Sequence, residues 1–336
     1  KTLETDYRNY NNIFIFIALI SLIMVCGFRY NSGTDYWTYM DIYKSAPQAF
    51  VSEVQDPGFM VICKFLNEFS DNPQLLFLVS AIIINVLIVN ILRKKSTKYE
   101  LSMYLYITTY VYYSTFNGVR QWIAAAIIFS ATKYLFERKF KKYLVIVILA
   151  SFIHASALIM IPVYFIVNNK PLSLKNMIII LIFIGCSIAY VPFINLLFKL
   201  LEGTQYAHYF DIMLDAENGA NLLRIPVYFA PIFIFGIFYD KLNPNREKEI
   251  DIIFNMCILG FLIMILATKQ MFFARLIYYF DLYYLLLIPR IAKIGCKKFN
   301  RLFYYILIVL YFASSYVLLI VGDSQILPYS LKITLF

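Results

Sequence analysis

Charged residues are scarce in this sequence. Asp, Glu, Lys and Arg make up 15% of its 336 residues, whereas soluble domains carry about 25%. Because 61% of the residues are hydrophobic and 18% are aromatic, too little polar surface is left to cover a soluble core of this size. The shortage of charge therefore excludes a soluble protein and indicates a membrane protein. The long apolar runs between short charged segments also exclude a coiled coil, a collagen, a disordered tail and a disulfide-stapled secreted module.

Cysteine patterns that hold disulfides or metals are also lacking. The five cysteines form no C-x-x-C pair and have no histidine at metal-ligand spacing: Cys26, Cys63, Cys186, Cys257 and Cys296. Neither a disulfide framework nor a zinc site is indicated, and we interpret these residues as buried thiols.

Long apolar runs predict membrane-spanning helices. A helix needs about 20 apolar residues to cross the roughly 30 Å hydrocarbon core, and irregular backbone cannot cross because its polar groups would stay unpaired. We expect spans at 13–28, 73–92, 101–115, 119–136, 177–200, 222–239, 250–267, 272–288 and 302–321. Residues 143–167 could be one tilted helix or two half-spans that meet at 152–156.

The positive-inside rule favours two half-spans. They place most of the 30 Lys and Arg on one side, including the basic clusters at 93–98, 138–142 and 290–301. A single helix would instead put the last of these clusters on the other side. We therefore predict an all-α polytopic membrane protein in which residues 1–336 form one integral domain of about eleven crossings. Its N-terminus is cytoplasmic, and a broken helix pair at 143–167 faces protein or a wet cavity.

This topology also accounts for the net charge of +10. Basic residues on the cytoplasmic face lie beside anionic lipid, where each contributes about 1 kcal/mol. The excess therefore predicts contact with membrane lipid, and no nucleic acid partner is expected.

Two loops at 29–72 and 201–222 lie on the outer face in this topology, and we expect both to contribute to an active-site cavity. The first has apolar residues at helical spacing at Tyr36, Tyr39, Met40 and Tyr43, and again from Phe59 to Phe69, behind Asp56-Pro57. Two short amphipathic helices are therefore expected in the membrane interface. Their aromatic residues could anchor the protein's depth or stack on sugar rings, and the sequence leaves both interpretations open.

Four arginines stand at the outer ends of different predicted spans: Arg29, Arg120, Arg224 and Arg275. An arginine fork suits phosphate, although each could instead reach lipid headgroups or pair with an acidic loop residue. We favour Arg120 because residues 116–121, FNGVRQ, combine a tight turn, a helix start and two strong hydrogen-bonding side chains.

His154 lies at the predicted helix break, on the outer side. It could be a hydrogen-bonded core residue or a base, since imidazole titrates near neutral pH and can accept a proton from a hydroxyl. Asp281 is a carboxylate at membrane depth and needs a partner. Arg275, six residues earlier, is too far round the helix for good pairing.

Four motifs in order carry a family resemblance: GFRY with GTDY at 27–36, DPGF at 56–59, NGVRQWIA at 117–124 and FIHASA at 152–157. Over residues 27–164 the chain resembles the EpsG/Wzy-type family of bacterial polysaccharide polymerases, which make capsule, exopolysaccharide or O-antigen. The family pattern usually has Glu where this chain has Asp56. Members of that family usually begin with a further span, which fits the absence of an initial methionine here.

The resemblance implies a GT-C-like glycosyltransferase of the bacterial cell (inner) membrane. It would join oligosaccharide repeat units carried on undecaprenyl diphosphate, as donor and acceptor, at the extracytoplasmic face. Flippase and chain-length regulator proteins would be candidate partners. A flippase or transporter of the same lipid-linked sugar, or a ligase of the same chemistry, is the alternative function.

Residue roles follow from this chemistry. His154 is our first choice for the base that deprotonates the acceptor hydroxyl, with Asp35 as its rival, and Arg120 stabilises the diphosphate. The remaining residues that we expect to bind substrate are Arg29, Tyr36, Glu53, Asp56, Gln121, Arg224 and Arg275. No Asp-x-Asp motif lies in the outer loops, so we expect neither a metal nor a cofactor.

Overall fold

The computed structural model describes residues 2–51, 56–201, 219–294, 297–321 and 325–333. Helices make up 77% of the chain, which confirms an all-α fold. The chain divides into two compact units, and each is described by itself. The first comprises Lys1–Tyr134, Lys141–Leu158 and Tyr305–Phe336, and the second comprises Leu135–Phe140 and Ile159–Tyr304.

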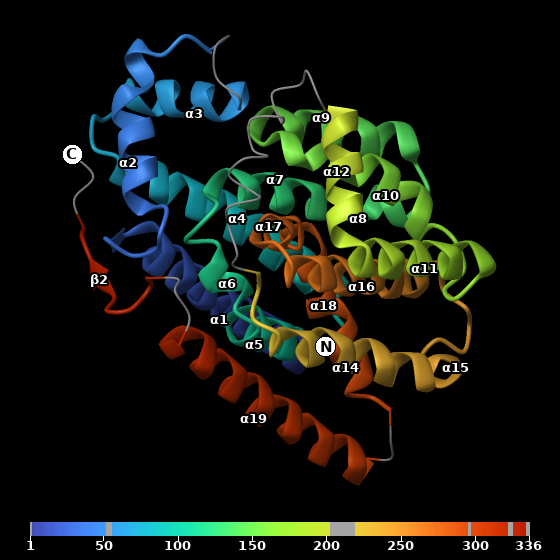
Figure 1. Ribbon diagram of the computed structural model, residues 1–336. Coiled ribbons are helices and arrows are strands. Elements are labelled where there is room, and N and C mark those ends of the chain that lie inside the picture. The colour runs from blue at the N-terminus through green and yellow to red at the C-terminus, as the bar shows by residue number, and fades with distance from the viewer. Residues whose placement is uncertain (1, 52–55, 202–218, 295–296, 322–324, 334–336) are drawn as a thin grey trace. The chain divides into compact units, whose positions relative to one another are not determined.

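The elements up to His154 are the following (Figure 1): α1 Thr2–Gly27, β1 Arg29–Tyr30, α2 Tyr36–Ser45, a 3-10 turn Ala46–Gln48, α3 Pro57–Asn67, α4 Gln74–Lys95, α5 Tyr99–Thr108, α6 Val111–Ser114, α7 Val119–Ser130, α8 Thr132–Phe136 and α9 Phe140–Ile153. Those after it are a 3-10 turn Ala155–Ile159, α10 Met160–Val167, α11 Leu174–Ile188, α12 Tyr190–Leu201, α14 Arg224–Ile237, α15 Tyr239–Leu242, α16 Lys248–Ala267, α17 Met271–Leu276, α18 Tyr278–Ile291, α19 Lys297–Val321 and β2 Ser330–Leu331.

Helix α4 is the centre of the first unit, with α1 and α7 packed against it. The side chains of Ala124, Ala125 and Ala126 on α7 are all buried. Small residues let helices approach closely, which drives helix association where lipid supplies no hydrophobic force. This packing fixes the position of the first turn of α7, which carries Arg120, within the first unit.

Helices α1 and α4 run antiparallel. The Gln74 Nε2 at the start of α4 donates to the Gly27 carbonyl at the end of α1, 2.6 Å away. At the opposite end, Arg93 Nη2 donates to Asn12 Oδ1 at 2.6 Å. The basic last turn of α4, Arg93 to Lys95, is therefore at the other end of this helix pair from the 29–72 segment.

The two short helices expected in the 29–72 segment are present as α2 and α3. Helix α2 buries Tyr36, Tyr39 and Tyr43, and α3 begins at Pro57, where a proline costs no helical hydrogen bond. Phe69, which the periodicity assigned to the apolar face, lies past the end of α3 and is exposed.

The helix break expected between 152 and 156 is also present. Helix α9 ends at Ile153, His154 is not helical, and a 3-10 turn begins at Ala155. A second feature of the first unit was not predicted: β1 pairs with β2 in an antiparallel ribbon, with Arg29 opposite Leu331. This pairing holds residues 330–331 beside the end of α1.

Helix α16 is the core of the second unit and packs against α10, α11, α14, α17 and α18. The most apolar stretch of α16 is 83% buried. Helix α19, most of which belongs to the first unit, has only 17% of its most apolar stretch buried. The exposed apolar side chains on α19, such as Leu302, Val309 and Phe312, suit contact with lipid rather than water.

Fewer long spans are present than the sequence predicts. In the described parts of the chain three helices are long and apolar enough to cross a membrane, or four when a bent pair is included. That pair is α11 and α12, which meet at 101° where a straight span was expected at 177–200. The expected span at 101–115 is also interrupted, because Tyr110 takes a left-handed conformation with φ 72°. The crossing number and the GT-C likeness stay predictions.

Candidate functional site

The site in the first unit is organised by Asp56, the residue before α3. Gly58 lies two residues further on, where an added Cβ would be 2.8 Å from the Phe152 carbonyl oxygen. Only glycine therefore lets the start of α3 approach the end of α9 this closely. The close approach brings Asp56 beside His154 at the helix break.

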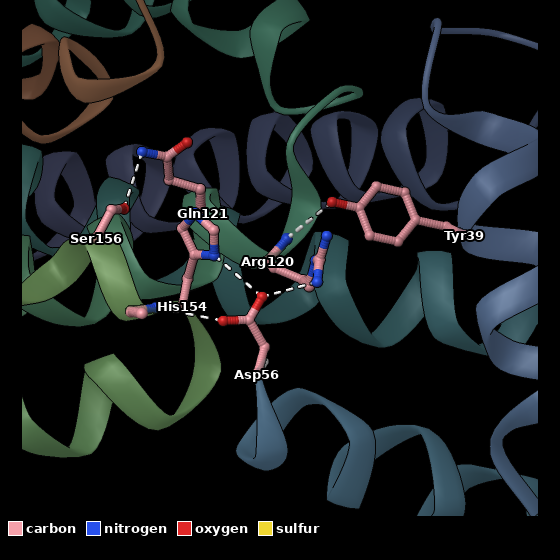
Figure 2. A network of polar contacts seen from close by, with 7 residues as sticks. Tyr39, Asp56, Arg120, Gln121, His154 and Ser156 are labelled. Atoms are coloured by element: carbon pink, nitrogen blue, oxygen red, sulfur yellow. Dashed lines mark hydrogen bonds and ion pairs between the residues drawn. The ribbon is translucent and has the colours of Figure 1, made fainter. Parts of the chain in front are cut away.

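Asp56 joins three motifs through its carboxylate, as Figure 2 shows. Arg120 Nη1 donates to Oδ2 at 2.7 Å, and His154 Nδ1 lies 3.1 Å from the same oxygen. The Ala155 amide donates to Oδ1 at 3.3 Å. The Asp56 side chain is only 6% exposed, while those of Arg120 and His154 are 32% and 28% exposed. The carboxylate is thus buried beneath two partly open groups.

The environment keeps Asp56 ionised. Burial by itself raises the pKa of the carboxyl, but the hydrogen bond and charge of His154, the charge of Arg120 and the Ala155 amide together lower it below its usual value. When His154 is neutral, an ionised Asp56 favours the tautomer with the proton on Nδ1. Nε2 then carries a lone pair, which is the arrangement that a general base requires.

Arg120 is held by the first turn of α7 and by α2. Its backbone N–H donates to the Tyr39 hydroxyl at 3.3 Å, and its guanidinium lies about 6 Å from the ring centres of Tyr39 and Phe59 (6.0 and 5.9 Å). Burial raises the pKa of Tyr39 despite the opposing charge of Arg120, so the phenol stays neutral. These contacts fix Arg120 in a geometry that can present a guanidinium edge to an anion.

Asp35 also supports the 116–121 turn, which leads into α7. Its Oδ2 accepts a hydrogen bond from the Gly118 amide at 2.8 Å, and its own amide donates to Asn117 Oδ1 at 3.3 Å. Gly33 has φ +100°, and a Cβ there would lie 2.6 Å from Asn117 Oδ1. The hydrogen bonds described for the Asp35 side chain go to Gly118 and to Thr34, and none goes to His154.

Gln121 makes a second link between α7 and the helix break. Its Nε2 lies 3.1 Å from Ser156 Oγ (Figure 2), and the Gln121 side chain is buried. Gln121 thus bonds to Ser156, two residues after His154, while the adjacent Arg120 bonds to Asp56, which itself contacts His154.

Arg29 and Tyr36 lie deeper than the sequence suggested. Arg29 is 1% exposed, donates to the Cys26 and Phe116 carbonyls at 2.7 and 3.1 Å, and lies 4.4 Å from the Phe77 ring centre. Tyr36, also buried, stacks on Phe77. Arg29 supports the start of the 116–121 turn through the Phe116 carbonyl, and Tyr36 packs on the same Phe77 ring as Arg29. Direct contact of either residue with substrate stays a prediction.

Trp37 is a candidate that sequence reasoning missed. Its ring is 50% exposed, packs edge-on against Tyr30 and Tyr36, and is oriented by a 2.7 Å hydrogen bond from Nε1 to Asn31 Oδ1. Because the adjacent Tyr36 is buried, Trp37 is the better placed of the two to stack on a sugar ring. The signal was a tryptophan in a polar loop, one of only two in the chain.

The second unit contains its own buried network. The Tyr228 hydroxyl on α14 donates to Asp281 Oδ1 on α18 at 2.6 Å, and Arg224 Nη2 lies 3.5 Å from that hydroxyl. Tyr228 is thus the direct partner that Asp281 requires, and Arg224 lies next to the Tyr228 hydroxyl. Arg275 belongs to the same unit, on α17, and Glu53 lies outside the described residues.

No group of three His, Cys, Asp or Glu side chains that could hold a metal ion is found in the described segments. Metal independence stays a prediction. The site's chemistry comes from a carboxylate, an imidazole and a guanidinium that three distant motifs bring together.

The sequence matches the family model described as EpsG family over residues 12–331. This match confirms the resemblance that the four motifs carried and extends it beyond residue 164. No curated protein and no solved structure matches the chain.

Proposed function

This chain belongs to the EpsG family, and on that basis we propose that it is a membrane glycosyltransferase that polymerises polysaccharide repeat units. Family membership supports a polysaccharide polymerase in general. The finer proposal is that donor and acceptor are oligosaccharides on undecaprenyl diphosphate, joined at the extracytoplasmic face of the bacterial cell membrane into capsule, exopolysaccharide or O-antigen.

The observation that carries the proposal is the contact of Asp56 with both Arg120 and His154. In the reaction, an acceptor hydroxyl forms the new glycosidic bond at the donor's anomeric carbon, and the bond from that carbon to the diphosphate oxygen breaks. Undecaprenyl diphosphate leaves with the electron pair. His154 Nε2 takes the hydroxyl proton, and Asp56 stabilises the resulting imidazolium.

Arg120 suits the leaving group. A guanidinium about a third exposed above a buried carboxylate can turn further donors toward a diphosphate, whose negative charge grows as the bond breaks. The same geometry argues against Asp35 as the base, because its carboxylate is occupied by the Gly118 amide. We propose that Asp35 positions the turn that carries Arg120.

Two features support an outer location for the site. The Arg93 to Lys95 turn is at the end of α4 opposite the 29–72 segment, and basic residues favour the cytoplasm. Helix α4 has 22 residues, or about 33 Å, enough to separate the two ends by a membrane.

The β1–β2 pairing supports the parity of the proposed topology. It requires residues 30 and 330 to lie on the same side of the membrane, and hence an even number of crossings between them. Two half-spans at 143–167 give ten crossings in our topology, and a single helix would give an odd number. We propose the total of eleven crossings on this basis. The single domain over 1–336 and the GT-C-like architecture are proposed alongside it.

The remaining residues complete the proposal. We propose that Gln121 and Trp37 line the approach to His154, and that Arg29 and Tyr36 support the residues around this approach. Glu53, Arg224, Arg275 and the 201–222 loop are proposed to bind substrate. Flippase and chain-length regulator proteins are the proposed partners.

The decisive experiment incubates purified full-length protein in lipid with a synthetic undecaprenyl-diphosphate repeat unit alone. A ladder of products is expected for wild type and none for Arg120→Ala or His154→Ala. Movement of the lipid across vesicles without product would identify a flippase. In a separate incubation to which a foreign acceptor is added, transfer to that acceptor alone would identify a ligase.

A further inference from the structure

A cavity of about 590 Å³ lies within the second unit. It is lined by the turn at Arg138, by residues 168–171 after α10, by Tyr239 on α15 and by the first turn of α16. Its size is in the range of small-molecule sites. In the proposed topology these segments all face the cytoplasm, so the cavity is separate from the polymerisation site.

The charge of the lining favours an anion. Four basic side chains contribute to it, Arg138, Lys170, Arg246 and Lys248, against one carboxylate, Asp251. That carboxylate already accepts hydrogen bonds from the Tyr239 hydroxyl and from Asn243 Nδ2.

Arg246 also pairs with Asp240 just outside the lining, at 2.6 Å. Both side chains of this pair are well exposed, and an exposed ion pair holds its partners weakly. The four basic side chains therefore outnumber the carboxylates around the cavity.

Backbone strain is concentrated at the same place. Arg138 and Arg246 adopt left-handed conformations, with φ 54° and φ 52°, and so does Leu172, next to the lining, with φ 54°. Residues other than glycine rarely take this conformation, and it persists where the surrounding structure holds it. Arg138 is held by a 2.7 Å hydrogen bond from Nη2 to the Asn168 carbonyl. The strained backbone keeps both arginines at the cavity's edge.

Asn168, one of the residues that line the cavity, carries an unsatisfied acceptor. Asn168 Oδ1 is buried, and no donor in the described chain reaches it, although its Nδ2 donates to the Tyr164 carbonyl at 2.7 Å. A buried oxygen without a donor is costly unless a ligand or water supplies one. The cations suit a phosphate, and Asn168 Oδ1 suits a hydroxyl attached to it.

We propose that this cavity is a binding site for a phosphate ester that carries free hydroxyl groups. The phosphate sits among Lys170, Lys248 and the two arginines, and a hydroxyl donates to Asn168 Oδ1. Two sources share this chemistry: the headgroup of a glycerol-type phospholipid in the cytoplasmic leaflet, and a free polyol phosphate from the cytoplasm.

The test measures binding to purified full-length protein in neutral detergent. Phosphatidylglycerol is titrated and retained lipid is counted by native mass spectrometry, and glycerol 3-phosphate is titrated by calorimetry. The test variant is Lys170→Gln/Lys248→Gln. Its matched control is Lys175→Gln/Lys241→Gln, which removes two exposed lysines of the same unit that do not line the cavity.

Wild type and control are expected to bind one of the two probes, and the test variant to bind it about 25-fold more weakly. This figure allows a factor of about five for each lysine beside an anionic group. Lipid binding alone identifies the headgroup as the ligand, and binding of glycerol 3-phosphate identifies a free phosphate. Equal loss in the test and control variants, or no binding of either probe, overturns the proposal.

A second measurement isolates the hydroxyl. Phosphatidylmethanol has the same phosphate charge as phosphatidylglycerol but no free hydroxyl. If the lipid is the ligand, wild type should retain phosphatidylglycerol several-fold more strongly. Equal retention of the two lipids would overturn the role given to Asn168.

Discussion

Replacing Asp56 with asparagine should separate the chemistry of the Asp56, Arg120 and His154 contact from its structural role. Asparagine keeps the shape of the side chain and an acceptor for the Ala155 amide, but it removes the negative charge. The His154 Nδ1 proton then loses its ionic acceptor, and the tautomer with Nε2 protonated becomes favourable. An imidazole in that state cannot take a proton from the acceptor hydroxyl.

The expected loss of rate is about 10²- to 10⁴-fold, the range that a positioned general base contributes. The loss of folding stability should be much smaller. Hydrogen bonds to charged groups contribute about 1.5–3 kcal/mol, but Arg120 and His154 are each about a third exposed, so solvent screening reduces this to about 1–2 kcal/mol.

The assay is polymerisation of synthetic lipid-linked repeat unit by purified protein, with thermal unfolding measured on the same samples. Asp35→Asn is the matched control, since it removes a carboxylate of the same segment that bonds to Gly118 and not to His154. It should lower stability and rate without changing the shape of the pH–rate profile. The profile of Asp56→Asn should change.

A double variant adds a stricter test. If Asp56 acts through His154, Asp56→Asn/His154→Ala should be no slower than His154→Ala alone, because residues that act as a unit are non-additive. Wild-type turnover by a folded Asp56→Asn protein would refute the reasoning, and so would full additivity of the two substitutions.

Four further predictions follow from the same geometry. Gly58→Ala should cost about 1–3 kcal/mol in unfolding experiments and lower the rate, because its Cβ meets the Phe152 carbonyl; Gly185→Ala, inside α11 with nothing within 4 Å, should instead stabilise the protein by about 0.5–1 kcal/mol. The stability advantage of wild type over Asp56→Asn should be complete at pH 7. It should vanish as the pH falls through the lowered pKa of Asp56, below about 4, because a depressed pKa stabilises the fold only above it; an unchanged difference at pH 3 would contradict the ion pair. Arg120→Lys should lose at least about tenfold in rate, since a point charge cannot serve Asp56 and a diphosphate together; a Lys variant with wild-type kinetics would remove the guanidinium's role. Trp37→Ala should raise the KM several-fold with little change in kcat, and Trp37→Phe should restore it; an unchanged KM would exclude the stacking role.

Much of the site's composition could be predicted from the sequence because its signals are local. The apolar runs indicate a membrane protein through composition alone. The spacing of Tyr36, Tyr39 and Tyr43 predicts α2, and the helix break at His154 follows from parity and charge. Arg120 stands out because a turn, a helix start and a fork-shaped cation occur within six residues.

Contacts between distant segments could not be predicted in this way. Asp56 pairs with groups 64 and 98 residues away, and the choice of Asp56 over Asp35 as the partner of His154 depends on how closely α3 approaches α9. Periodicity places Asp281 inside a span but does not say that Tyr228 of α14 lies beside it. The burial of Arg29 is likewise a result of packing against Phe77.

The sequence by itself determined that this is a membrane protein, which side of the membrane its basic residues favour, and which few residues are able to do chemistry. These follow from the properties of single residues and of neighbours along the chain. Tertiary structure alone decided which of those residues meet, because a contact at 3 Å depends on the packing of helices, and at Gly58 on the absence of one Cβ. The cavity beside Arg138 and Arg246 is of the same kind, since segments more than 100 residues apart form it.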